Sequence, residues 1–140
     1  MRKKLYLVLS VFLLIGIPLL CFGLSSDEGE ENQDGLAFPV KDYGPAWMKS
    51  DRNEDGNTDY AVQLDQNGNL KKEVMDFNYD GYMDDFYFFK DGKLVRQEVD
   101  SNYDHKIDIW VYVTDNVYIE RYERDTDFDG EIDEVEDFTE

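Results

Sequence analysis

Short runs of apolar residues alternate with acidic and turn-forming segments along the second half of the chain. From residue 60 onward, these runs are rich in Val, Ile, Phe, Tyr and Trp. They are too short for helices, and their β-branched and aromatic content favours strands. The predicted strands cover residues 60–64, 70–75, 86–89, 94–99, 109–113 and 117–122, with a short edge strand within 134–140.

Tight turns separate the strands of each predicted pair. The turns are Asp65-Gln66-Asn67-Gly68, Asp91-Gly92 and Asp115-Asn116, and Asp, Asn and Gly tolerate the positive φ angles that short hairpins need. The pattern therefore predicts an all-β antiparallel meander of about seven strands, with hairpin turns at one end.

An acidic nine-residue segment precedes each hairpin. Its form is D-x-[DN]-x-D-[GH]-x-x-D, and it begins at Asp51, Asp76, Asp100 and Asp125, spaced 25, 24 and 25 residues apart. A fixed period of this size is typical of repeat architectures. The fold expected is thus a meander of β-hairpin repeats with a period of about 25 residues and acidic loops at the other end.

The loops have the ligand chemistry of a calcium site. Calcium takes six to eight oxygen ligands, and a loop with oxygen-bearing side chains at positions 1, 3 and 5 wraps them around one point. Position 7 contributes a backbone carbonyl, position 9 contributes a carboxylate or its water, and position 6 turns sharply with positive φ. The predicted ligands are Asp51, Asn53, Asp55, Asp59, Asp76, Asn78, Asp80, Asp84, Asp100, Asn102, Asp104, Asp108, Asp125, Asp127, Asp129, Asp133 and Glu136.

These segments resemble the EF-hand family of calcium loops and their relatives in dockerin, thrombospondin type 3 and FG-GAP repeats. The strand-like flanks are most similar to FG-GAP loops, and the tandem array resembles bacterial exported calcium-binding repeat proteins. The resemblance covers only nine residues of each unit, and the helices that flank a true EF-hand loop are absent from the pattern.

Two further departures concern individual positions. Position 12 of an EF-hand carries a bidentate Glu, and here it is Val62, Tyr87, Val111 and Glu136. Only the last fits, so we expect affinities on the order of 10⁻⁴–10⁻³ M, as in extracellular modules. His105 replaces Gly at position 6 of the third loop, and His tolerates positive φ, so a weaker third site is expected.

Position 8 of each loop is expected to point inward. It is occupied by Thr58, Met83, Ile107 and Ile132, three of them apolar. The competing interpretation is that Asp, Asn and Gly serve only as turn residues. Four loops in one register, with apolar residues at position 8, favour the metal interpretation.

The first 25 residues have the layout of an export signal. Basic Arg2, Lys3 and Lys4 precede an apolar run over residues 5–20 and a small, polar stretch. Three outcomes stay open: cleavage after Gly23 or Ser25 with soluble release, lipid attachment at Cys21 as in bacterial lipoproteins, or an uncleaved membrane anchor. Each predicts a periplasmic, cell-surface or extracellular location, with residues 26–50 as an acidic spacer and lead-in and residues 51–140 as the four repeats.

Charge narrows the classes of partner. The net charge of −19 repels nucleic acids and anionic lipids and favours cations or basic proteins, so contact with a membrane is expected only through a lipid anchor or an uncleaved signal. The single cysteine excludes an intramolecular disulfide. No catalytic set is recognisable around His105, so we expect a non-enzyme: an exported calcium-binding protein with a structural, adhesion or interaction role. The alternative is a partner-binding or inhibitor protein that uses an apolar sheet face, with acidic turns that bind no metal.

Overall fold

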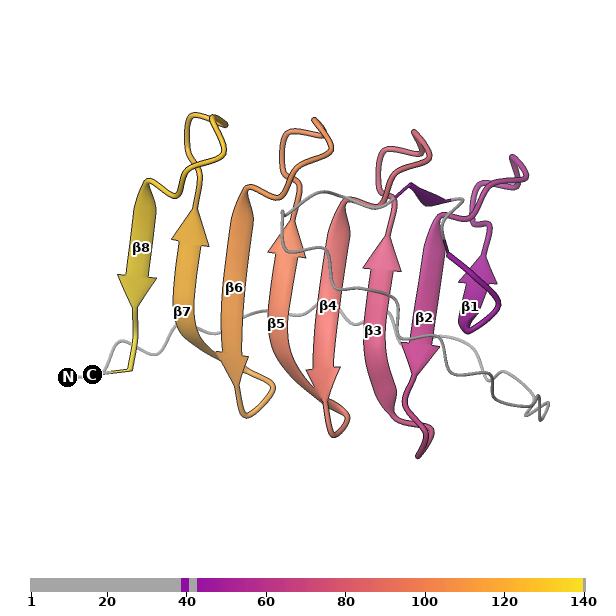
Figure 1. Cartoon of the computed structure of the whole chain (residues 1–140), viewed down its shortest axis with the longest axis horizontal. Helices are drawn as coiled ribbons and strands as arrows, with labels where there is room; N and C mark the ends of the chain where they lie inside the picture. Colours follow the sequence, from indigo (N-terminus) through magenta and orange to yellow (C-terminus); the bar gives the residue numbers. More distant parts are fainter. Residues whose placement is uncertain (1–38, 41–42, 140) are drawn as a thin grey trace.

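Eight antiparallel strands form one sheet in which the order in space follows the order in the chain (Figure 1). The computed structural model describes residues 39–40 and 43–139. The strands are β1 (Trp47–Ser50), β2 (Tyr60–Leu64), β3 (Leu70–Met75), β4 (Asp85–Lys90), β5 (Lys93–Val99), β6 (Ile109–Thr114), β7 (Tyr118–Arg124) and β8 (Glu134–Asp137). The predicted all-β antiparallel meander is therefore confirmed over these residues.

The predicted signal segment at residues 1–25, with Cys21, lies outside the described residues, as does most of the spacer. The described part contains no helix with the length and apolar character needed to cross a membrane.

The prediction of about seven strands was wrong by one strand, β1. Residues 47–50 were expected to belong to an irregular lead-in, yet they pair with β2 from Trp47↔Gln63 to Ser50↔Tyr60. This four-residue strand is too short and too polar to show an alternating pattern of its own. The template supplied by β2, rather than the local sequence, makes it a strand.

Two of the three hairpin turns have positive φ at both predicted residues, whereas in the β2–β3 turn Gly68 has positive φ and Asn67 does not. Asp91 and Gly92 have φ angles of 52° and 72°, and Asp115 and Asn116 have 51° and 68°. Two successive residues with positive φ match the right-handed twist of the flanking strands. These turns and the β2–β3 turn lie at the lower edge in Figure 1.

Apolar side chains cluster on both faces of the sheet, because successive residues of a strand point to opposite faces. One buried cluster consists of Tyr43, Ala61, Val74, Met83, Phe86 and Ile107, with Val40, Trp47, Phe88 and Trp110 packed against it. The other consists of Leu94, Val111 and Val113, with Tyr87, Phe89, Ile109, Ile119 and Tyr122 around it.

The lead-in contributes an aromatic lid to the first cluster. Tyr43 is buried and meets Trp47 edge to face, with ring centroids 4.7 Å apart. The lead-in also donates a backbone hydrogen bond from Val40 N to the carbonyl oxygen of Gly81, at 2.9 Å. It is thereby fixed to the loop between β3 and β4.

The position-8 residues follow the expected inward orientation except at the end of the sheet. Met83 and Ile107 belong to the first cluster, whereas Ile132 is 45% exposed. The prediction for Ile132 was wrong because the last loop stands beside the edge strand β8, all of whose residues are exposed.

A buried carboxylate occupies the start of β4. Asp85 accepts hydrogen bonds from Gln97 Nε2, at 2.9 and 3.0 Å, and from the Tyr87 hydroxyl at 2.9 Å. Burial, which outweighs these bonds, raises the pKa of Asp85 to about 6. The ionised side chain therefore opposes folding at neutral pH.

This burial predicts that acid stabilises the metal-free protein. Between the ordinary pKa of Asp and about 6, the folded state binds more protons than the unfolded state, so stability falls as pH rises. We expect Asp85 to contribute about 1 kcal/mol of added stability on going from pH 7 to pH 5. Urea unfolding in chelator should show this increment in the native chain and in Asp91→Asn, a control at an exposed turn. If the stability of Asp85→Asn depends on pH as strongly as that of the native chain, the increment does not come from Asp85.

Candidate metal centre

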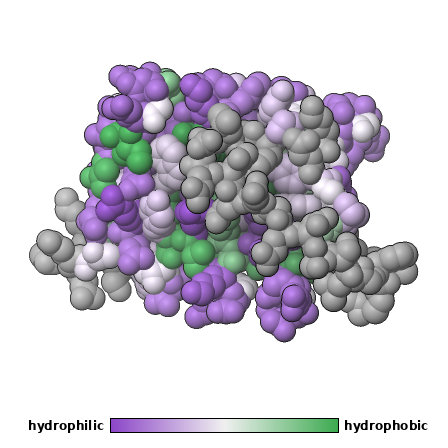
Figure 2. All heavy atoms as spheres, viewed as in Figure 1, coloured by the Kyte–Doolittle hydropathy of each residue, from purple (hydrophilic) through white to green (hydrophobic). Residues whose placement is uncertain are grey.

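The four acidic loops all lie along one edge of the sheet, at the top of Figure 1. They connect β1 to β2, β3 to β4, β5 to β6 and β7 to β8. Since strands alternate in direction, every second connection falls at the same edge. Neighbouring loops are two strands apart, which corresponds to about 10 Å. Figure 2 shows hydrophilic side chains along this edge.

The loops share one backbone conformation. Position 4 has a φ angle between 62° and 64° in all four, and position 6 has 93°, 91°, 70° and 96° in chain order. The position-6 residues are glycines in three loops and His105 in the third. The expectation of positive φ at position 6 is met at every loop, whereas the turn at position 4 was not anticipated.

Backbone N–H groups of each loop point inward at the carboxylates. The first aspartate accepts a hydrogen bond from the N–H of position 6 at 2.8, 2.9, 2.8 and 2.7 Å in the four loops. The position-5 aspartate accepts one from the N–H of position 7 at 2.8 to 3.0 Å. These bonds hold the carboxylates in place, and most of their second oxygens also accept hydrogen bonds within the loop, as Asp76 Oδ1 does from the Tyr79 N–H and Asp55 Oδ2 does from Asn53 Nδ2.

The position-9 aspartate joins each loop to the sheet. Asp59 Oδ2 accepts the N–H groups of Arg52 and Asn53 at 2.6 and 3.1 Å. Asp84 Oδ2 likewise accepts those of Phe77 and Asn78 at 2.7 and 3.2 Å. Asp59 and Asp84 are only 2% and 1% exposed.

The second oxygen of these two carboxylates has no partner. Asp59 Oδ1 and Asp84 Oδ1 are both buried without a hydrogen bond. An unpaired buried carboxylate oxygen is costly, and such groups in native proteins are paired or coordinate metals. These two atoms are therefore the strongest structural indication of a cation.

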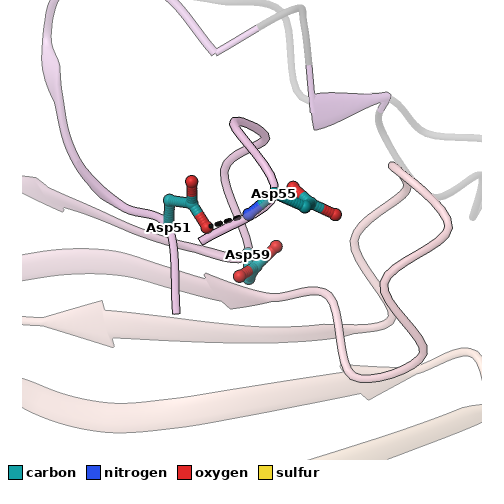
Figure 3. Close-up of side chains that lie close together, drawn as sticks. All are labelled: Asp51, Asp55 and Asp59. Atoms are coloured by element: carbon teal, nitrogen blue, oxygen red, sulfur yellow. Dashed lines mark hydrogen bonds between the residues drawn. The ribbon is translucent and has the colours of Figure 1, made fainter. Parts of the chain in front are cut away.

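Three of the loops bring carboxylate oxygens together at the spacing of metal ligands. The groups are Asp51, Asp55 and Asp59 (Figure 3), then Asp76, Asp80 and Asp84, and finally Asp125, Asp127 and Asp133, each with oxygens within 4.8 Å of one another. These carboxylate groups can hold a metal ion. Within the described residues, Asp100, Asp104 and Asp108 of the third loop form no such group.

The remaining predicted ligands lie outside these three groups. Asn53, Asn78 and Asn102 each accept the N–H of the position-5 residue through Oδ1, at 2.9 to 3.0 Å. Asp129 belongs to the fourth loop but not to its carboxylate group. Glu136 lies within β8 opposite Tyr122, two residues beyond the strand's first residue.

Burial and repulsion between neighbouring charges raise the pKa of several loop carboxylates. Burial raises the pKa of Asp84 to about 6, and it also raises the pKa of Asp76 and Asp100. Repulsion from Asp129 and then Asp133 raises the pKa of the exposed Asp127. A divalent cation would relieve both penalties, because it favours the ionised form of every neighbouring carboxylate.

Sequence reasoning missed a direct link between neighbouring loops. The N–H of the first aspartate in a loop donates to the carbonyl of the position-9 aspartate in the preceding loop. The bonds run from Asp76 to Asp59 at 2.8 Å, from Asp100 to Asp84 at 2.8 Å and from Asp125 to Asp108 at 2.9 Å. The repeat spacing was the available signal, since it places these residues side by side at the same edge.

Comparison with known proteins identifies no family. No protein-family model matches the chain, and no curated protein matches it. A solved structure of accessory secretory protein 1, 2 and 3 of Streptococcus pneumoniae aligns with 73% of this chain at 17% identity and a TM-score of 0.39. This chain spans 21% of the matched chain, and a TM-score of this size does not establish a shared fold.

The unpaired oxygen of Asp84 predicts opposite effects of one substitution. Asp84→Asn removes a buried charge, so we expect the Tm in chelator to stay constant or rise. In millimolar calcium the same variant lacks a ligand, and its calcium-dependent gain in Tm should be smaller by about 4–8 °C, equivalent to about 1 kcal/mol. Calorimetry with and without chelator measures both.

The matched control is Asp91→Asn, which removes one charge at the opposite edge of the sheet. It should leave the calcium-dependent gain unchanged. If Asp84→Asn and Asp91→Asn respond alike to calcium, the position-9 carboxylate is not a ligand.

Proposed function

We propose that the chain is an exported calcium-binding repeat protein with a structural, adhesion or interaction role in the cell envelope or outside the cell. The observation that carries the proposal is the pair of buried, unpartnered oxygens, Asp59 Oδ1 and Asp84 Oδ1. They belong to loops whose other carboxylates gather at ligand spacing. Binding, rather than catalysis, is the activity that we infer.

Calcium is the cation that the donor set favours. Carboxylates, Asn carbonyls and backbone carbonyls are hard oxygen ligands, and calcium accepts them in flexible geometry. Position 12 supplies no ligand in the first three loops, because Val62 and Val111 are buried apolar residues and Tyr87 donates its hydroxyl to Asp85. Water would complete the coordination, which supports weak binding suited to millimolar extracellular calcium.

The fold gives cation binding a structural consequence. The chain has a net charge of −19, and the four acidic loops at one edge of the sheet concentrate repulsion there, which opposes compaction. Ions that bind only the folded state stabilise it by mass action. The export signal at residues 1–25, with either release or lipid attachment at Cys21, would deliver the protein to a compartment where calcium is available.

A second candidate function, partner binding, is favoured by aromatic side chains at the loop tips. Tyr79, Tyr103 and Phe128 occupy position 4 with positive φ, a conformation unfavourable for bulky residues, and their exposed fractions are 49%, 48% and 36%. Neither burial nor backbone preference explains these rings. In this alternative they face a protein partner, and the fold is stable without metal.

Isothermal titration calorimetry on the purified protein tests the proposal. We expect uptake of three calcium ions at the first, second and fourth loops, which form the carboxylate groups, with weaker binding at the third. Magnesium should bind less well, because it demands near-ideal octahedral geometry.

A variant with Asp59, Asp84 and Asp133 all changed to Asn serves as the control and should lose most of the uptake. Absence of calcium uptake by the native chain at millimolar concentration would reject the proposal. A stable metal-free fold would then make partner binding the leading function.

A further inference from the structure

The sheet ends in two strands that pair on one side only. Among the described residues, β1 pairs with β2 alone and β8 pairs with β7 alone. Neighbouring strands are antiparallel and their number is even, so β1 and β8 run in opposite directions at the two ends of the sheet (Figure 1). A β1 strand laid beside β8 of another copy therefore continues the antiparallel sheet, and the acidic loops of both copies lie along the same edge.

We propose that this chain assembles head to tail, by antiparallel pairing of β8 of one copy with β1 of a second copy. Such a contact uses different surfaces on the two copies, so it generates open chains of molecules rather than a closed dimer. The inference goes beyond the proposed function, because it concerns the ends of the sheet and holds whichever cation the loops bind.

The repeat itself defines the register of this pairing. Where one repeat meets the next, the residue directly after the position-9 aspartate lies opposite the residue directly before the next first aspartate. The internal boundaries are Tyr60↔Met75, Asp85↔Val99 and Ile109↔Arg124. The equivalent residues at the two ends of the sheet are Glu134, which begins β8, and Ser50, which ends β1.

With Glu134 opposite Ser50 of the second copy, both terminal strands are paired over their whole length, since each has four residues. An exposed strand edge is a template for such pairing, because its N–H and C=O groups lack strand partners. The remaining pairs in this register are Val135↔Lys49, Glu136↔Met48 and Asp137↔Trp47.

The hydrogen bond between successive loops would also continue across the contact. Inside the sheet, the carbonyl of each position-9 aspartate accepts the N–H of the first aspartate in the next loop, at 2.8 to 2.9 Å. Within the described residues, the carbonyl of Asp133 and the N–H of Asp51 make no backbone bond of this kind. The proposed register brings these two groups together, so both ends of the series gain the bond that the internal loops already have.

The last repeat exposes apolar side chains that the internal repeats bury. Ile132 and Val135 are 45% and 49% exposed, whereas Met83 and Ile107 at position 8 and Phe86 at position 11 are buried. In repeat proteins each unit buries its apolar residues against its neighbours, and a terminal unit that ends the stack has a polar outer face. The outer side of β8 is instead apolar at Val135, as expected where a further strand follows.

The charges of the two strands are complementary. β8 carries Glu134, Glu136 and Asp137, whereas β1 carries Lys49 and no acidic residue. In the proposed register Lys49 lies on the same face as Asp137, at a diagonal position where opposite charges attract. The net charge of −19 repels whole copies from one another, so salt that screens this repulsion favours assembly.

Disulfide trapping tests the register. Met48→Cys and Glu136→Cys are introduced together, with Cys21→Ser, and the protein is oxidised mildly in about 0.5 M NaCl, which screens the net charge. Residues directly opposite in an antiparallel pair have Cα atoms about 4.5–5.5 Å apart, which suits a disulfide. Within one copy the two sites are seven strand spacings apart, roughly 33 Å. We expect a ladder of covalent dimers and longer chains on a non-reducing gel.

The matched control is Met48→Cys with Asp137→Cys, again with Cys21→Ser. Its register is offset by one residue, which places the two thiols on opposite faces of the sheet, so little ladder should form. An equal ladder in this control, or no ladder in either variant, overturns the proposal. Covalent dimers of Glu136→Cys alone would show that β8 pairs with a second β8, and they overturn it as well.

Sedimentation of the native chain measures assembly without cross-links. Its average mass should rise with concentration from the micromolar to the millimolar range. Val135→Lys places a lysine opposite Lys49 of the second copy, and this repulsion should weaken association about fivefold. Val117→Lys adds the same charge at an exposed site beside the β6–β7 turn and should leave association unchanged. A native chain that stays monomeric, or equal effects of the two lysines, overturns the proposal.

Calcium binding is read separately, because both experiments are run in chelator and in millimolar calcium. Association without calcium uptake rejects the proposed function and leaves the assembly intact. Calcium uptake by a protein that stays monomeric in both conditions does the reverse.

Discussion

Burial of the position-9 aspartates Asp59, Asp84 and Asp108 is the constraint on which the loop edge of this protein depends. Asp84 illustrates the hydrogen bonds that such an aspartate makes. Its N–H donates to the carbonyl of Met75, its carbonyl accepts the N–H of Asp100, and its Oδ2 accepts two N–H groups from its own loop. One side chain thus ties together a loop, the end of a strand and the next loop. Burial strengthens these hydrogen bonds, and it also makes the unpaired oxygen, Asp84 Oδ1, destabilise the folded state.

This arrangement explains why a sheet one layer thick can carry so many carboxylates at one edge. The hydrogen bonds from backbone N–H groups hold the aspartates in place, but they satisfy only some of the oxygens. The charge that remains is the feature that a divalent cation would neutralise. Because the loops are bonded to one another through Asp59, Asp84 and Asp108, order at one loop supports order at the next. Cation binding and the stability of the whole sheet are therefore expected to be linked.

Much of the fold follows from local signals in the sequence. Asp91-Gly92 and Asp115-Asn116 specify their hairpins because few other residues adopt positive φ twice in succession, and the β-branched and aromatic runs specify the central strands. The strand β1 was not predictable in this way, since Trp47–Ser50 becomes a strand only by pairing with β2. The exposed Ile132 shows a similar limit, because it follows from the position of the last loop beside the exposed strand β8 and not from the motif.

In the candidate site, too, local contacts could be predicted from the sequence and contacts between loops could not. Loop spacing identifies the residues that converge within each loop, since those contacts are local. The contact of His105 with Asp80 joins residues 25 positions apart, and the bonds between successive loops also depend on how the sheet sets their separation. Such relations come from register and strand spacing, which a nine-residue motif does not encode.

A crystal structure of the protein grown in millimolar calcium would test the central claim most directly. The account predicts one ion about 2.3–2.6 Å from Asp59 Oδ1 and a second ion at the same distance from Asp84 Oδ1, the range of calcium–oxygen bonds. Density for ordered water alone at these two oxygens, with the loops in the same conformation, would contradict it.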